Sequence, residues 1–179
     1  MDTTEQDAAG RARRGDRGAM ESLYRQYQPS VARLCRQMIE SEDEAADAAQ
    51  EVFLRVLRSI DRYDPVLSFR VWLFSVARHV IVDQLRRRGK WWDIENDLRR
   101  LPPNYAEESL DPLLRGESRE RLREAVQRLP APYRLVVIAV MWHDFTPSEV
   151  AELLGVPAGR VRVHLFRALK LVEKELSGP

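Results

Sequence analysis

Apolar residues recur along most of the chain at intervals of three and four, the spacing that gives a helix one apolar face. Three such stretches occupy 16–39, 43–60 and 68–88. The first contains Pro29, at which it can divide into two helices. The third begins at Ser68, whose hydroxyl suits the N-cap position. Three amphipathic helices in succession predict a small helical bundle.

The segments around this bundle are predicted to be irregular. "RYDPVLS" is expected to be a loop, because Pro65 forces the residue before it out of the helical region. We predict a flexible N-terminus over 1–15 and a first domain over 16–92. Residues 93–117 contain three prolines and have weak periodicity, so they are predicted to be a linker.

The second domain is predicted over 118–179 and is also helical. "SRERLREAVQRLP" is expected to be one helix, ended by Pro130. "PYRLVVIAVMWHDF" is a second helix, apolar on nearly every side at its centre, which is typical of a buried helix in a small bundle. The fold class is therefore all-α, with two small helical domains joined by an acidic linker.

Residues 146–170 combine two helical patterns with a strand-like middle, "GRVRVH". Thr146 and Glu149 form a capping box, and Gly155 with Pro157 ends that helix and begins the next. Five apolar residues then follow at helical spacing: Val161, Leu165, Ala168, Leu169 and Val172. Their spacing outweighs the short alternation, so helix is predicted. Two short helices around a Gly-containing turn form a helix-turn-helix.

Five residues of the second helix are predicted to contact duplex DNA: Arg160, Arg162, Val163, His164 and Arg167. Arginine suits guanine edges and phosphates, and valine can touch a thymine methyl group. A helical hairpin with a solvated basic face is the alternative.

Charge is segregated along the chain although the net charge is only +1. Residues 40–64 hold eight acids and three bases, and 65–92 hold six bases and one acid. Residues 93–117 hold seven acids and three bases. Separate sites for a polyanion and for another partner would produce such blocks, as would ordinary solvated faces.

The basic block contains candidates for binding single-stranded nucleic acid. Its aromatic candidates are Tyr63, Phe69 and Trp72, because unpaired bases stack on aromatic rings beside a cationic track. The core is the alternative place for Phe69 and Trp72. Arg86, Arg87 and Arg88 are predicted phosphate contacts.

Composition points to a cytoplasmic protein of 179 residues without membrane insertion. The single cysteine, Cys35, excludes an intramolecular disulfide and is predicted to be a buried thiol. The longest apolar run has eight residues, whereas a bilayer requires roughly 20. No leader-like segment is visible.

Enzymatic chemistry is not predicted. The three histidines, His79, His143 and His164, show no metal-ligand spacing with cysteines or acids. No nucleophile–base signature or phosphate-cradling glycine loop is present in the sequence. We therefore predict no catalytic site, metal or cofactor.

Three blocks in order resemble the bacterial extracytoplasmic-function (group IV) RNA polymerase sigma factors. "DEAADAAQEVFLRVLRSID" resembles the segment that docks on the β′ clamp helices of the polymerase. "FRVWLFSVARHVIVDQLRRR" resembles the segment that melts and reads the minus-ten element. "LPAPYRLVVIAVMWHDFTPSEVAELLGVPAGRVRVHLFRALKLVEKEL" resembles the helix-turn-helix domain that reads the minus-thirty-five element. Together they cover about 16–176.

The resemblance implies a role for particular residues. Five of them would lie at or beside the polymerase surface: Asp47, Gln50, Glu51, Phe53 and Leu54. The core is the alternative for Phe53. The 61–70 loop, including Tyr63 and Asp64, would face flipped bases with Trp72 and His79.

Some residues depart from the family pattern. His79 stands where asparagine is usual, and "GRVRVHLFRAL" differs from the common recognition helix. These departures leave the promoter sequence open. The implied function is directing core RNA polymerase to promoters, through the β′ clamp helices and the β flap, under control of an anti-sigma factor. An autonomous helix-turn-helix regulator is the alternative.

Overall fold

The computed structural model describes residues 3–91 and 119–177, and every regular element within these ranges is a helix. The chain divides into two compact units, 1–87 and 88–179. The all-α prediction is therefore confirmed for the part of the chain that the structure describes. The linker predicted over 93–117 lies outside the described residues.

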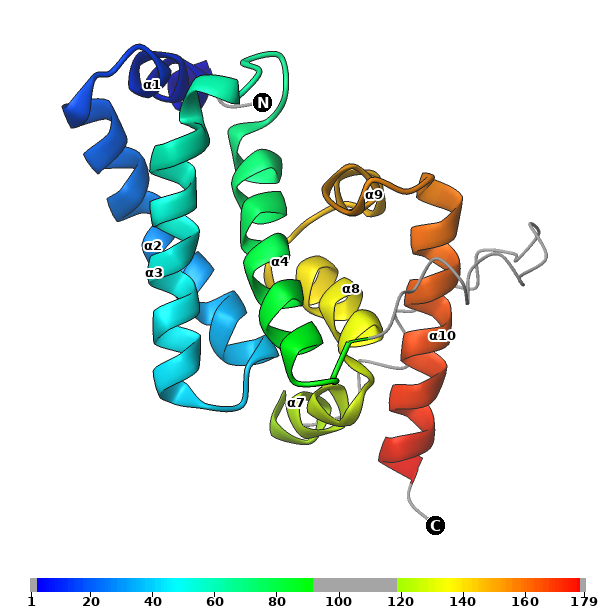
Figure 1. Ribbon diagram of the computed structural model, residues 1–179. Helices are drawn as coiled ribbons and strands as arrows, with labels where there is room; N and C mark the ends of the chain where they lie inside the picture. Colours follow the sequence, from blue (N-terminus) through cyan, green and yellow to red (C-terminus); the bar gives the residue numbers. More distant parts are fainter. Residues whose placement is uncertain (1–2, 92–118, 178–179) are drawn as a thin grey trace. The chain divides into compact units, whose positions relative to one another are not determined.

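The N-terminal unit is built on three helices that lie side by side: α2 (Arg17–Met38), α3 (Glu42–Ser59) and α4 (Phe69–Arg87) (Figure 1). Asp16 caps α2 by accepting from the backbone N–H of Ala19 at 3.0 Å. Ser41 caps α3 in the same way. These caps satisfy N–H groups that a helix start leaves without an intrahelical partner.

Pro29 does not divide the first predicted stretch, because α2 runs through it. The proline lies on the exposed side of the helix, while Tyr27 and Val31 on either side of it are buried. Water can therefore hydrogen-bond the carbonyl that loses its helical partner. Continuous burial of the opposite face keeps the helix in one piece.

The prediction of a flexible N-terminus over 1–15 was wrong for 3–13, which form helix α1 (Thr3–Arg13). Helix α1 contacts α2 and α4 at one end of the bundle (Figure 1). Its buried residues are Ala9 and Ala12, which allow close approach because they are small. The signal was weak in the sequence because this apolar face contains no bulky residue.

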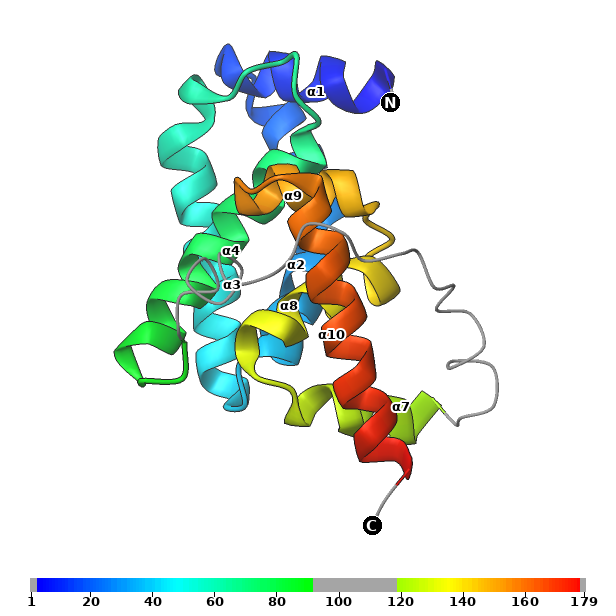
Figure 2. The ribbon, with the colours of Figure 1, turned by 90° about the vertical axis from the view of Figure 1, so that its right-hand side faces the viewer.

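The C-terminal unit surrounds one apolar helix, α8 (Ala131–Trp142). Helices α7 (Arg119–Arg128), α9 (Pro147–Leu154) and α10 (Ala158–Ser177) all contact it (Figure 2). Nine consecutive residues of α8, from 131 to 139, are buried. The prediction of a central buried helix is confirmed.

The turn between α9 and α10 has the predicted chemistry. The Thr146 hydroxyl accepts from the Glu149 N–H at 3.2 Å, and the Glu149 carboxylate accepts from the Thr146 N–H at 2.8 Å. Gly155 ends α9 in the left-handed conformation, with φ of 67°. A glycine adopts this conformation without the steric cost that a Cβ would impose.

Replacing Thr146 with alanine should lower the free energy of unfolding by ~1 kcal/mol, because the hydroxyl that accepts from the Glu149 N–H is lost. Urea unfolding followed by circular dichroism measures the change. Ser148→Ala is the matched control, since it removes an exposed hydroxyl from the same helix. Equal losses in the two variants would contradict the role of the capping box.

The thiol of Cys35 should be inert in the folded chain. Its side chain is completely buried, and burial raises the pKa of the thiol to about 12. Only a thiolate is reactive, so a disulfide reagent at pH 8 should label Cys35 slowly in buffer and rapidly in urea. Rapid labelling of the native chain would show that this core opens readily.

Candidate nucleic-acid and polymerase interfaces

Helix α10 presents one face to the solvent and buries the other. Arg162 is exposed, and Arg160, Val163 and Arg167 are half-buried. The capping box and the Gly155 turn determine where this helix begins. An exposed helix face of this kind can enter the major groove of DNA, which is about 12 Å wide.

His164, predicted to contact DNA, is instead part of the core of the C-terminal unit. It is only 3% exposed, and its ring centroid lies 5.0 Å from that of Tyr133 in α8. The physical reason is its spacing, three residues after Val161 and four before Ala168, both of which are buried. The apolar periodicity of the helix could have shown this.

One pair on the outer side of α10 was missed by the sequence prediction. The Lys170 ammonium lies 5.8 Å from the centroid of the Phe166 ring and 3.1 Å from the Glu173 carboxylate. Phe166 is half-buried and follows Val163 by three residues. It therefore extends the exposed face of α10 by one turn.

Tyr63 and Phe69 were named as candidates to contact unpaired bases, but both are buried, with 1% exposure each, which for Phe69 is the alternative that the sequence left open. Their rings meet edge to face at 5.4 Å, and Phe69 also packs against Tyr27 at 5.7 Å. The Tyr63 hydroxyl donates to the Leu67 carbonyl at 2.7 Å. Burial of this aromatic cluster shapes the loop from within, so neither ring is available to stack on a base.

Trp72 lies at the edge of the same cluster and keeps part of its surface exposed. Its ring centroid is 5.3 Å from that of Tyr63 and 5.7 Å from that of Phe69. Trp72 is half-buried, so one part of its ring packs in the core and the other part faces solvent. Trp72 remains a candidate for contact with an unpaired base.

The loop between α3 and α4 is compact and carries an apolar tip. It begins with the short helix η1 (Ile60–Arg62). The exposed carboxylate of Asp64 accepts from the Val66 N–H at 3.0 Å. Val66 and Leu67 are 78% and 41% exposed. Both residues belong to the 61–70 loop that the resemblance places against flipped bases, although neither was named individually as a site residue.

The exposed surface of α4 is basic towards its C-terminal end. Arg86 and Arg87 at the end of α4, and Arg88 directly after it, are exposed; their contact with phosphates stays a prediction. His79 is also exposed, and its Nδ1 donates to the Ser75 carbonyl at 2.7 Å. That bond directs the other ring nitrogen, Nε2, away from the helix backbone.

Helix α3 exposes an acidic and apolar face. Asp47, Gln50 and Leu54 are exposed, with Leu54 at 46%. Glu51 is half-buried and accepts from the Arg55 guanidinium at 2.8 Å. This hydrogen bond holds the pKa of Glu51 below its usual range. Glu51 is therefore partly engaged within the unit, whereas Asp47 is presented to solvent.

Arg55 connects the acidic face of α3 with α4. Its guanidinium donates hydrogen bonds to Glu51 on its own helix and to Asp83 on α4, the latter at 3.0 Å. Gln84 of α4 adds a hydrogen bond to Glu44 of α3 at 3.3 Å. These contacts hold the register between the acidic helix and the basic helix.

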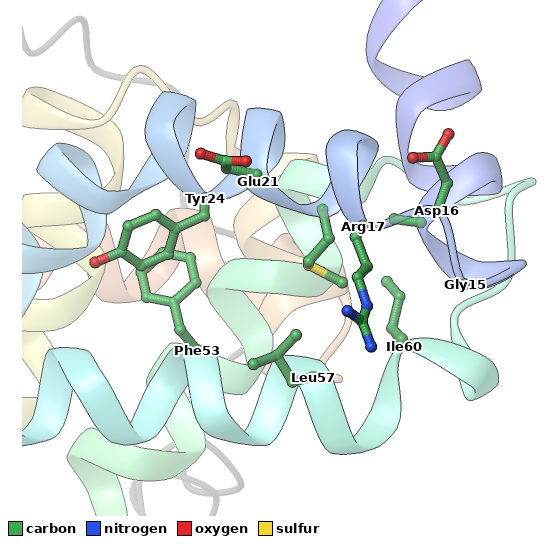
Figure 3. Close-up of a pocket in the computed structure, with 10 residues that line it drawn as sticks. Gly15, Asp16, Arg17, Glu21, Tyr24, Phe53, Leu57 and Ile60 are labelled. Atoms are coloured by element: carbon green, nitrogen blue, oxygen red, sulfur yellow. The ribbon is translucent and has the colours of Figure 1, made fainter.

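Phe53 forms one wall of an open groove between α2 and α3 (Figure 3). The groove has a volume of about 430 Å³. The Tyr24 ring lies 4.7 Å from the Phe53 ring in an edge-to-face arrangement. Tyr24 and Leu57 are 46% and 54% exposed. The apolar periodicity of both helices predicts that these residues belong to the core. In the structure they line the groove instead and remain exposed to solvent.

Within 3–91 and 119–177, no group of three or more histidine, cysteine or acidic side chains is arranged to hold a metal ion. Among the same residues, no helix has the length and apolar character needed to cross a membrane.

Comparison with protein families matches both units. A family model described as sigma-70 region 2 matches residues 23–90, and one described as sigma-70 region 4 matches 119–172. The ECF RNA polymerase sigma factor SigW of Bacillus subtilis is 25% identical over 172 residues, covering 92% of each chain. The ECF RNA polymerase sigma factor SigE of Mycolicibacterium smegmatis is 32% identical over 161 residues, covering 86% of this chain and 61% of that relative.

Two solved structures share the fold. CnrH, in complex with the cytosolic domain of CnrY, has a TM-score of 0.72 and 20% identity, with 97% of each chain covered. The sigma factor RpoE from Bartonella quintana, in complex with the anti-sigma factor NepR, has a TM-score of 0.66 and 18% identity, covering 88% of this chain and 96% of that one. Since both sigma-70 regions occur in order and the relatives match most of its length, the chain belongs to the extracytoplasmic-function sigma factors.

Proposed function

We propose that this sigma factor directs core RNA polymerase to promoters by dividing three contacts between its two units. The observation that carries the proposal is the pairing, in one chain, of a helix-turn-helix with a separate bundle whose α3 face is acidic and apolar. A bundle that only dimerised a repressor would not need a basic helix, α4, joined to that face. The protein would act in the cytoplasm, where core polymerase is found.

The C-terminal unit would read the minus-thirty-five element with α10. Arg160, Arg162, Val163 and Arg167 are the contacts that its exposed face supports. Arginines can donate two hydrogen bonds to guanine, and Val163 offers an apolar contact to a thymine methyl group. His164 would act indirectly, by packing α10 against α8.

The N-terminal unit would bind the opened minus-ten element. Asp64 and the exposed tip of the loop, with Trp72 and His79, would meet the unpaired bases. Arg86, Arg87 and Arg88 would contact phosphates, which supply affinity without reading sequence. Stacking and an electrostatic track together are how proteins hold single strands.

Polymerase would dock on α3. Asp47, Gln50 and Leu54 provide an exposed acidic and apolar strip, and Phe53 and Leu57 continue it into the groove. This surface complements a basic coiled coil with apolar side chains, the character proposed for the β′ clamp helices. The C-terminal unit would contact the β flap.

An anti-sigma factor would hold the protein inactive. The two structural relatives were solved in complex with CnrY and with the anti-sigma factor NepR, respectively. A partner of this kind would compete with polymerase for exposed apolar surface such as the α2–α3 groove. Release of the partner would then be the regulated step.

Replacing Arg162 with alanine should weaken promoter binding by ~1–3 kcal/mol and relax specificity at one base pair, if this residue reads a base. Promoters are first found by mapping the transcripts that the holoenzyme makes. The minus-thirty-five element of each promoter is then varied, and the affinity of the holoenzyme for each version is measured. Lys174→Ala, also exposed on α10, is the control. Uniform weakening across sequences would reassign Arg162 to a phosphate contact.

Replacing Asp47 with lysine reverses the charge at this position. The change should weaken binding to core polymerase by about tenfold, because one close charge contact becomes repulsive. Asp47 is suited to this test because it is exposed and outside the Glu51–Arg55–Asp83 contacts. Glu124→Lys, an equal charge change in the other unit, is the control. Unchanged affinity for the core would remove α3 as the docking surface, and tight operator binding without polymerase would favour an autonomous regulator.

A further inference from the structure

Helix α1 makes three contacts at the α3–α4 loop: two with the loop itself and one with the first turn of α4. Gln6 Nε2 donates to the Pro65 carbonyl at 3.4 Å, near the tip of the loop. At the start of the loop, Arg13 Nε donates to the Asp61 carbonyl at 3.2 Å. Beyond its end, Glu5 Oε1 accepts from the backbone N–H of Arg70 at 3.2 Å. The three contacts therefore span the loop from its entry to its exit.

The contact from Glu5 caps α4 with a side chain from another helix. The first N–H groups of a helix have no intrahelical acceptor, and a carboxylate there is also favoured by the helix dipole. Ser68 accepts from the Val71 N–H at 3.4 Å, so Glu5 and Ser68 satisfy different groups. Glu5 consequently helps to determine where α4 begins, one turn before Trp72.

The negative charge of Glu5 also acts on the interior of the loop. Burial raises the pKa of the Tyr63 hydroxyl, and the negative charge of Glu5 raises it further. That hydroxyl donates to Leu67, next to the exposed loop tip. The carboxylate is thus near the aromatic cluster that shapes the loop from below.

Helix α1 is itself firmly held. Ala9 and Ala12 are 0% and 4% exposed where they pack on the bundle. The Arg11 guanidinium bonds the Asp16 carboxylate at 2.6 Å, and that carboxylate also caps α2. Because α1 is anchored to the bundle in this way, its side chains can hold the loop in a fixed position relative to the bundle.

The loop that α1 supports has an exposed tip suited to touching a base. Val66 and Leu67 are apolar and accessible, so the tip offers an apolar surface that an unpaired base can contact. Surface loops are ordinarily mobile, and binding then includes the cost of ordering them. Contacts that order the loop beforehand would improve discrimination between bases.

We propose that α1 shapes the minus-ten reading loop, with Glu5, Gln6 and Arg13 as positioning residues and Val66 and Leu67 as the surface presented to the unpaired bases. This rests on the proposed function of the N-terminal unit. None of the three positioning residues needs to touch DNA. Their removal should change which minus-ten sequences are used while leaving polymerase docking and minus-thirty-five reading intact.

The test uses full-length protein with core polymerase and two duplex libraries, one randomised over the minus-ten element and one over the minus-thirty-five element. Sequencing the transcripts gives the preference at each position. The variant combines Glu5→Ala, Gln6→Ala and Arg13→Ala. The control combines Asp7→Ala, on the same helix, with Arg14→Ala, directly after its last residue; both positions are exposed, and the pair removes one acid and one base.

We expect the triple variant to lose about threefold to tenfold of its discrimination at one or more minus-ten positions, the effect of losing one or two hydrogen bonds that hold the loop. Preferences at the minus-thirty-five element and affinity for core should stay within about twofold of the parent, the scatter expected for surface changes. Glu5→Gln alone should retain discrimination, since its amide oxygen can still accept from Arg70.

Two results would overturn the inference. One is an unchanged minus-ten preference in the triple variant. The other is a proportional fall in minus-ten preference, minus-thirty-five preference and core affinity, because α1 would then support only the fold. If the parent protein selects no motif from either library, the proposed function fails, and that outcome is distinct from both.

Discussion

The burial of one apolar stripe per helix is the constraint on which every surface of this protein depends. Both units are small, and each helix must contribute a full stripe to its core if the unit is to be stable. The residues that α3, α4 and α10 expose are therefore those that lie outside the buried stripe of each helix. In α10, Val161 and Leu165 face the core, so Arg162 is directed to solvent.

The N-terminal unit joins two chemically opposite surfaces through a few polar contacts. Arg55 binds Glu51 and Asp83, linking an acidic helix with a basic one at distances of 2.8 and 3.0 Å. Solvent-accessible ion pairs of this type contribute little to stability. Here they hold α3, whose exposed side is the proposed polymerase surface, in register with α4, whose exposed side is the proposed DNA surface.

Side chains from distant parts of the sequence also define the loop between those helices. The Tyr63–Phe69 contact supports it from within, and α1 contacts it from outside. The residues at positions that the family resemblance places near bases thus differ in burial. Tyr63 and Phe69 maintain the shape of the loop, while its apolar tip and Trp72 remain accessible.

The sequence by itself determined the helical class, the capping box, the left-handed turn at Gly155 and the charged helix faces, because these depend on residues within a few positions of one another. Only the tertiary structure decided the place of α1, whose small apolar face was too weak a local signal. It also decided the burial of Tyr63, the choice of core over surface for Phe69, and the exposure of Leu57. An aromatic or histidine side chain is compatible with core and surface alike, so the neighbours that packing brings to it determine its role.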